Sequence, residues 1–222
     1  MPIIVTYTSA TNPYTDWLQD VIPDAPGLDT PYAVHVIRNT AIDFCTRTWA
    51  LQYDATGTMT ATDPSYDLVI PANTEVTGSI FVKAQKELVA DEQELDYANR
   101  RALAMLSAED GPPRYYSKHR VDEITFHPTP DAAYTFTNRL ALRPTRDSTD
   151  IDSDVFTRYR QGIAHGVLYR LMSQARKPWS DPAGALMHGA EYVRAIREAK
   201  IELLNDYTDE NLMVDLSMGV FA

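Results

Sequence analysis

The sequence predicts an α+β protein that is mainly α: a helical bundle with an inserted antiparallel β subdomain and an extended C-terminal arm. Apolar residues recur at three- and four-residue spacing in four segments, which is typical of helices with one buried face. Between about residues 56 and 144, and again near the C-terminus, they alternate with polar residues, as in strands. We therefore expect an N-terminal arm (1–29), a core (30–206) and a C-terminal docking tail (207–222).

The first core helix is predicted over about residues 31–53. Thr30 can cap its N-terminus, and Pro31 has the backbone angle of a first helical position. The apolar stripe of this segment consists of Val34, Ile37, Ala41, Phe44, Thr48 and Leu51. We expect four residues here to pack in the core: Val34, Ile37, Phe44 and Trp49.

The β subdomain is predicted over about residues 56–144. Residues 76–84 alternate in the manner of a half-buried strand, and residues 68–70 before Pro71 predict a shorter partner. A helix is expected between these strands and the next, over about 94–107, because Asp110-Gly111-Pro112-Pro113 is typical of a helix stop.

The most regular strand pattern of the chain covers Tyr134 to Leu142. Its expected partner is Val121 to Phe126, because the connecting residues 127–131, His-Pro-Thr-Pro-Asp, are typical of a turn. We predict that these two segments form an antiparallel hairpin.

Two closing helices are predicted over about residues 153–176 and 181–205. The short linker Lys177-Pro178-Trp179 predicts that they lie antiparallel. Gly162 and Gly166 stand four apart, which favours close approach of a neighbouring helix, and Trp179 is a further expected packing residue. The second helix carries an apolar arc of about 100°, formed by Leu186, Val193, Ile196, Leu203 and Leu204.

Charge and cysteine content restrict the function classes. The net charge of −11 disfavours a protein that binds nucleic acid tightly. An acidic channel wall would, however, repel DNA and let it pass through without binding. The single cysteine, Cys45, cannot form an internal disulfide, so we expect assembly in a reducing cytoplasm. No signal peptide and no run of about 18 apolar residues is evident, so we expect neither secretion nor a membrane span.

The chemistry-bearing residues do not form a recognisable catalytic or metal-binding pattern. The glycines do not form a phosphate loop, and the five histidines stand far apart. Cys45 lies on a predicted buried stripe, which favours packing over nucleophilic catalysis. Asp122 and Glu123 should point to opposite faces of a strand, which disfavours paired acid–base chemistry. We expect no catalytic residue, no metal and no cofactor.

Three blocks resemble the head-to-tail adaptor proteins of tailed bacteriophages, also called connectors or tail tubular proteins. The first is Ile37 to Trp49, which looks like the first core helix of that family. The second runs from Pro113-Arg114-Tyr115-Tyr116 through Ile124 to Asp131, with Arg143-Pro144-Thr145 at its exit. The third is Tyr159 to Leu171, with Lys177-Pro178-Trp179 and Asp181-Pro182.

The resemblance implies a structural protein of the virion neck, made in the host cytoplasm. It would form a ring, commonly of twelve copies, that joins the portal protein to the tail nozzle or tail tube and extends the DNA channel. Alternation in the tail suits portal docking by Leu212, Val214, Leu216, Met218, Val220 and Phe221. The alternatives are a head-completion or neck-stopper protein of the same assembly and, from another class, a small intracellular hydrolase.

Overall fold

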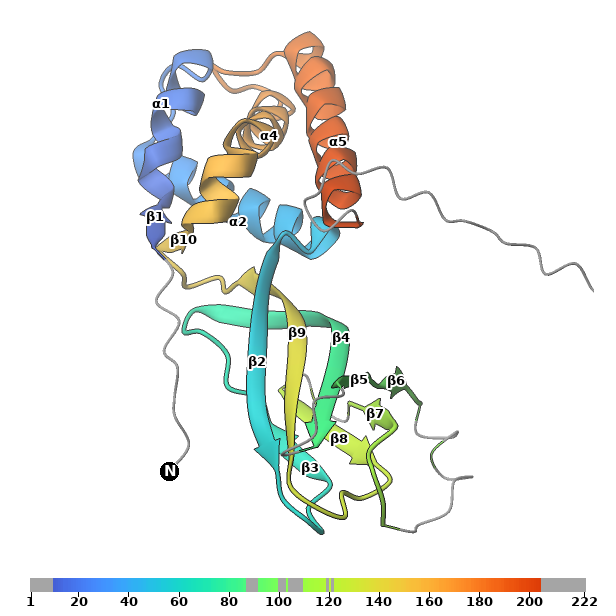
Figure 1. Ribbon diagram of the computed structural model, residues 1–222. Helices are drawn as coiled ribbons and strands as arrows, with labels where there is room; N and C mark the ends of the chain where they lie inside the picture. The colour runs from blue at the N-terminus through green and yellow to red at the C-terminus, as the bar shows by residue number, and fades with distance from the viewer. Residues whose placement is uncertain are drawn as a thin grey trace, which may run out of the picture.

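The computed structural model describes residues 10–86, 92–99, 103, 110–118, 120 and 122–204. A helical half lies above a β half in Figure 1. Within the described residues the α-helices are α1 (Leu18–Val21), α2 (Thr30–Thr48), α4 (Ser153–Met172) and α5 (Pro182–Leu204). Two four-stranded sheets and one two-stranded sheet accompany them, antiparallel except for one pair. The prediction of a mainly helical bundle is therefore wrong: this is a mixed fold in which sheet makes up a large share.

The N-terminal elements are part of the helical half. They are β1 (Thr11–Pro13), η1 (Tyr14–Trp17), α1 and η2 (Ile22–Asp24). Strand β1 pairs antiparallel with β10 (Asp150–Asp152), just before α4. The side chains of Tyr14, Trp17 and Val21 are fully buried. From residue 11 onward the expected arm is thus a packed part of the core, because its aromatic residues cover α2 and α4.

Helix α2 ends earlier than the predicted residue 53. Trp49 adopts a left-handed conformation with φ of 61°, and its N–H donates to the carbonyl of Cys45 at 2.9 Å. Two residues, 49 and 50, separate α2 from the strand β2 (Leu51–Met59). Its buried residues Leu51, Ala55 and Met59 are four apart, which imitates a helical stripe and explains the error.

The first four-stranded sheet has the order β2-β9-β4-β5. Strands β4 (Thr74–Lys86) and β9 (Tyr134–Pro144) confirm the two strongest strand predictions, and they pair antiparallel with each other. The short β5 (Glu92–Glu94) lies at the edge beside β4. The long strand β2 on the other side of β9 was not predicted.

The second four-stranded sheet has the order β3-β8-β7-β6, which differs from the predicted strand pairing. Its strands are β3 (Ser65–Asp67), β8 (Glu123–His127), β7 (Tyr115–Ser117) and β6 (Asp96–Tyr97). The predicted hairpin is wrong, because β8 and β9 belong to different sheets. These sheets face each other, with the rings of Phe126 and Phe136 5.1 Å apart. Turn chemistry at residues 127–131 fits a corner between sheets as well as a hairpin.

Two further predictions in the β half need correction. Residues 68–70 are not a strand; the strand β3 precedes them and pairs with β8. The predicted helix over 94–107 begins in strands β5 and β6. Leu103 is helical and donates its N–H to Asn99 at 3.1 Å, while residues 100–102 and 104–107 lie outside the described part.

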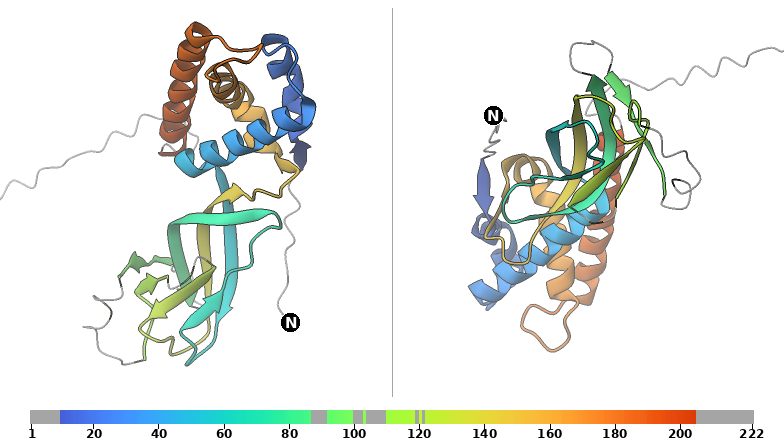
Figure 2. Two further views of the ribbon diagram at one scale, coloured as in Figure 1. Left: turned by 180° about the vertical axis from the view of Figure 1, so that it is seen from behind. Right: turned by 90° about the horizontal axis from the view of Figure 1, so that it is seen from below.

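The closing helices α4 and α5 lie antiparallel, as Figures 1 and 2 show. Arg158 meets Glu202 near one end of the pair, and His165 meets His188 further along. Helix α4 begins where the Asp152 carboxylate accepts the N–H of Asp154 at 2.8 Å, which satisfies a free donor of the first turn.

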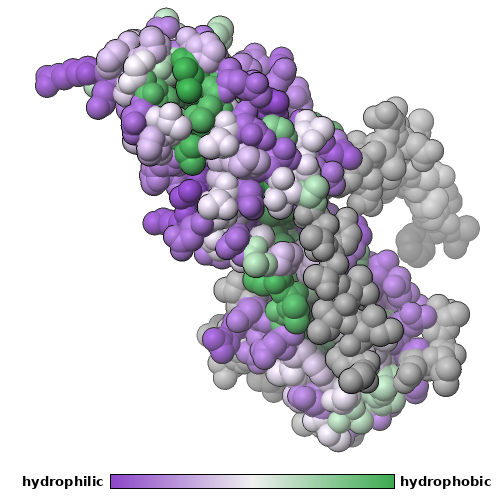
Figure 3. All heavy atoms as spheres, turned by 90° about the vertical axis from the view of Figure 1, so that its left-hand side faces the viewer, coloured by the Kyte–Doolittle hydropathy of each residue, from purple (hydrophilic) through white to green (hydrophobic). Residues whose placement is uncertain are grey.

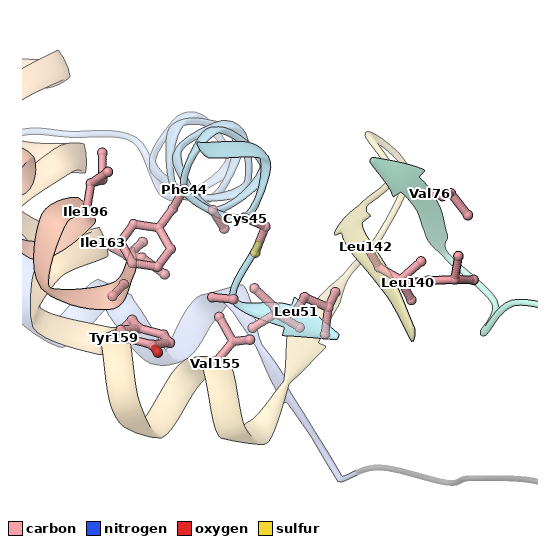
Figure 4. Packing of buried hydrophobic residues seen from close by; sticks show 14 of the residues in the cluster. Phe44, Cys45, Leu51, Val76, Leu140, Leu142, Val155, Tyr159, Ile163 and Ile196 are labelled. Atoms are coloured by element: carbon pink, nitrogen blue, oxygen red, sulfur yellow. The ribbon is translucent and has the colours of Figure 1, made fainter. Parts of the chain in front are cut away.

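One hydrophobic cluster joins the two halves (Figure 4). Phe44 on α2 faces Tyr159 and Ile163 on α4, whereas Cys45 points toward Leu51, through which the cluster continues into the sheet. Two short connections link the halves: residues 49–50 between α2 and β2, and residues 145–149 between β9 and β10. The β half is therefore held close under α2.

Candidate interaction surfaces

The packing residues predicted on α2 occupy different environments. Ile37 and Phe44 are fully buried, whereas Val34 is partly buried against the core. The Phe44 ring lies 5.2 Å from the Tyr159 ring and 6.3 Å from the Tyr192 ring, so it contacts α4 and α5 together. This residue is the point where the three long helices meet.

Gly162 and Gly166 lie where neighbouring helices come closest. A Cβ on Gly162 would lie 2.6 Å from the Cβ of Ala195 on α5. A Cβ on Gly166 would lie 2.7 Å from Thr40 Cγ2 on α2 and 2.7 Å from the Tyr192 ring. These distances are far shorter than normal carbon contacts, so the packing of α4 requires glycine at both places.

Trp49 and Trp179, the two tryptophans predicted to be packing residues, lie near the surface. Trp49 is 41% exposed, and its ring lies over Gly78 of β4, where an added Cβ would be 3.4 Å from it. Trp179 is partly buried against the core, and the Lys177 ammonium lies 5.7 Å from its ring centroid. Trp49 thus contributes to the surface at the junction of the halves.

A groove of about 620 Å³ opens beside Trp49, between the end of α5 and the first sheet. Phe81 and Leu203 supply part of its apolar wall. Among its basic residues, Arg47 pairs with Asp43 at 3.0 Å and Arg139 pairs with Asp54 at 2.8 Å. The groove is therefore apolar inside, and of its three basic residues only Lys200 has no ion-pair partner among the described residues.

Helix α5 carries two apolar arcs, and three residues of the predicted one face outward. Leu186 and Leu204 are 76% and 78% exposed, and Val193 is also exposed. The arc that packs against α4 and α2 lies roughly 120° around the helix and consists of Ala185, His188, Tyr192, Ile196 and Ala199. Only Ile196 belongs to both sets, and Leu203 of the predicted arc is partly buried against the core. The outer arc is a candidate contact surface.

The face that carries the N-terminal elements is mostly polar. Figure 3 shows this face, with hydrophobic side chains gathered in two small areas, one on the helical half and one on the β half. Ile22 and Tyr32, at the end of η2 and the start of α2, are among the exposed apolar residues. This second face has a different character from the outer face of α5.

The environments of Cys45, His165 and His188 shift the pKa of the Cys45 thiol and of His165. Burial raises the pKa of the Cys45 thiol to about 12, so the thiol stays protonated. The Nδ1 atoms of His165 and His188 lie 2.8 Å apart across the α4–α5 seam. Burial, followed by the neighbouring His188, lowers the pKa of His165. This pair was missed because its members stand 23 positions apart and meet only through the antiparallel alignment.

No acid–base pair emerges around β8 from the residues that can be placed. Asp122 lies 3.8 Å from Arg120, and burial lowers the pKa of His127, while His119 lies outside the described part. The described residues contain no group of three His, Cys, Asp or Glu side chains that could hold a metal ion. The exposed apolar residues on α5 and at the N-terminal elements make these two faces candidate contact surfaces.

The family model described as SU10 adaptor protein matches residues 5–215. The chain belongs to this family. An SU10 adaptor is a structural protein of the phage virion at the head–tail junction, where it interacts with other head and tail proteins, and the family is not a family of enzymes. The resemblance to phage head-to-tail adaptors is thereby confirmed.

The SU10 adaptor match includes both halves of the fold and the first part of the predicted tail. Leu212 and Val214 lie inside the matched range, whereas Leu216, Met218, Val220 and Phe221 lie beyond it. All six lie outside the described residues. No curated protein matches this SU10 adaptor. Among the helices of the described part, none has the length and apolar character to cross a membrane.

Proposed function

We propose that this protein forms a homo-oligomeric ring that joins the portal protein to the tail nozzle or tail tube and extends the DNA channel. Membership of the SU10 adaptor family across residues 5–215 carries the proposal. The exposed outer face of α5 and the groove beside Trp49 support it, because a protein that works inside an assembly needs apolar surface available to other chains.

The C-terminal tail is the proposed portal-docking element. Apolar residues occupy alternate positions from Val214 to Val220 and follow the acidic residues Asp206, Asp209 and Glu210. An extended segment of this kind can add as a strand to a partner, with alternate side chains entering pockets. The exposed Leu204 ends α5, a few residues before this segment.

The channel of the proposed ring lets DNA pass without binding it. Each copy has a net charge of −11, so a ring of copies repels a polyanion unless its basic residues all face inward. The purified ring should therefore fail to retain duplex DNA at about 50 mM salt, where phosphate contacts are strong. Micromolar DNA binding under those conditions, or a basic lumen in a ring structure, would contradict an acidic wall.

Binding to portal-filled heads tests the proposed function. Full-length protein should cosediment with heads that contain the portal, whereas a chain lacking residues 211–222 should not, although its core remains folded by circular dichroism. Two further variants of full length test whether binding depends on the apolar side chains of the tail or only on its length. Replacing Leu216, Met218 and Val220 by Ser should abolish binding, whereas Asp215→Asn with Ser217→Asn should not. Unchanged binding of the truncated chain would refute docking by the tail.

A further inference from the structure

The outer face of α5 combines apolar and unpaired basic side chains. Leu186, Val193 and Ile201 are exposed along it. Arg197 and Lys200 are exposed in the same region, and neither has an ion-pair partner among the described residues. The acidic residues nearby are already engaged: Glu198 pairs with Arg194, and Glu202 pairs with Arg158. This face therefore offers free positive charge beside exposed apolar surface.

The N-terminal face has the opposite character. Residues 14–32 contain four aspartates and no Lys, Arg or His. Asp20 pairs with Arg160 at 2.7 Å, whereas Asp24 and Asp29 are exposed and have no ion-pair partner in the part of the chain that can be placed. The exposed side chains of Ile22 and Tyr32 accompany them. This face therefore offers free negative charge beside apolar surface.

The two faces point away from each other because α2 and α4 lie between them. On one side Trp17 of η1 donates its indole N–H to the Arg160 carbonyl of α4 at 3.0 Å. On the other side the Tyr192 hydroxyl of α5 donates to Asp43 of α2 at 3.0 Å. Figures 1 and 2 show α1 and α5 on opposite sides of the helical half. One copy therefore cannot bring its own two faces together.

We propose that the outer face of α5 in one copy docks against the N-terminal face of a second copy. The two faces match in charge, with Arg197 and Lys200 opposite Asp24 and Asp29, and both supply exposed apolar side chains. A contact between two different faces of the same chain is heterologous, so repeating it generates a closed ring or an open helix. The proposal rests on the proposed ring and assigns the surfaces that build it.

Charge reversal with restoration tests this contact. The first variant is Arg197→Glu with Lys200→Glu. The second is Asp24→Lys with Asp29→Ser, which keeps a residue type that is favoured at the N-cap position before α2. In each variant alone the two faces carry charge of the same sign, so self-association should weaken at least tenfold in dissociation constant. In a mixture every contact is again between opposite charges, so the mixture should assemble.

Sedimentation velocity of the full-length protein between about 1 and 100 µM, at low and high salt, measures the association. The matched control is Arg120→Glu, which also reverses an exposed positive charge but lies in the β half. It should assemble as the wild type does. Thermal unfolding of each variant confirms that loss of assembly is not loss of fold.

The outcomes separate this contact from the proposed function. Assembly of the wild type, loss in both variants and recovery in the mixture support the contact. Assembly that survives both reversals overturns it and leaves a ring built on other faces. A wild type that stays monomeric at every concentration also overturns it, while cosedimentation with portal-filled heads still reports on the proposed function. Assembly that depends on residues 205–222 instead would make the chain's own tail the occupant of the α5 face.

Discussion

Replacing Gly166 by Ala tests the close approach of α2, α4 and α5. The added Cβ would lie 2.7 Å from Thr40 Cγ2 and 2.7 Å from the Tyr192 ring. Carbon atoms in good contact are about 3.5–4.0 Å apart, so these neighbours would have to move by roughly 1 Å. Both are fixed: the Thr40 hydroxyl donates to the Val36 carbonyl at 2.8 Å, and the Tyr192 hydroxyl donates to Asp43 at 3.0 Å.

The expected loss follows from two opposing effects. Overpacking of a well-packed core costs about 1–3 kcal/mol, whereas Ala in place of Gly inside a helix gains about 1 kcal/mol. We expect the free energy of unfolding to fall by about 1–2 kcal/mol. Gly189→Ala is the matched control, because its added Cβ meets the Tyr169 ring at 3.0 Å and that exposed ring can swing outward. We expect this control to gain up to about 1 kcal/mol.

Urea unfolding followed by far-ultraviolet circular dichroism measures both variants against the wild type. The slope of free energy against urea should be equal in all three, since each chain exposes the same surface on unfolding. If Gly166→Ala is as stable as the wild type or Gly189→Ala, the three helices are not held in fixed close contact, and the reasoning fails.

Three further predictions follow from single contacts. Cys45 should not react with a thiol reagent at pH 8 in the folded chain and should react fully in urea, because burial raises the pKa of its thiol to about 12; fast reaction without urea would contradict its burial. The part of the free energy of unfolding that depends on His165 should be constant above about pH 6.5 and should decline as the pH falls below it. The reason is that burial and His188 lower the folded-state pKa of His165 from 6.5. Urea midpoints at pH 7.5 and 5.5 should therefore differ less in His165→Asn than in the wild type, and an equal difference would exclude this group as a cause. Asp152→Ala should cost about 1 kcal/mol by removing the α4 cap, whereas Asp152→Ser should retain most of the stability in the same unfolding assay; equal losses would show that capping is not the cause.

The local start signals and the alternation in the sequence were reliable guides to several elements. Pro31 and the acidic residues before α4 mark helix starts, and alternation identifies β4 and β9. Pairing was not predictable, because a Pro-rich connection at residues 127–131 is compatible with a hairpin or with a passage between sheets. Strand β2 was hidden by its buried residues, whose four-residue spacing continues the stripe of the preceding helix.

The contact surfaces were predictable only in part. The outer arc of α5 is more apolar than the arc that packs inside, where Ala185 and Ala199 allow close contact and His188 is tolerated beside His165. Apolar content alone therefore does not identify the face of α5 that packs inside. The acidic N-terminal face is plain in the sequence, but its packing depends on Tyr14 and Trp17, which reach α4 only after the chain has folded.

The two short connections between the halves have a mechanical consequence. Residues 49–50 and 145–149 leave little slack, and the Tyr14 hydroxyl lies 2.9 Å from the Ser148 hydroxyl in the second of them. We therefore expect a force on the far ends of β2 and β9 to act on both α2 and the start of α4, because each strand is joined to the helical half by a short connection. We expect a displacement of the sheet to move the helical half with it, because so little free chain separates the two halves.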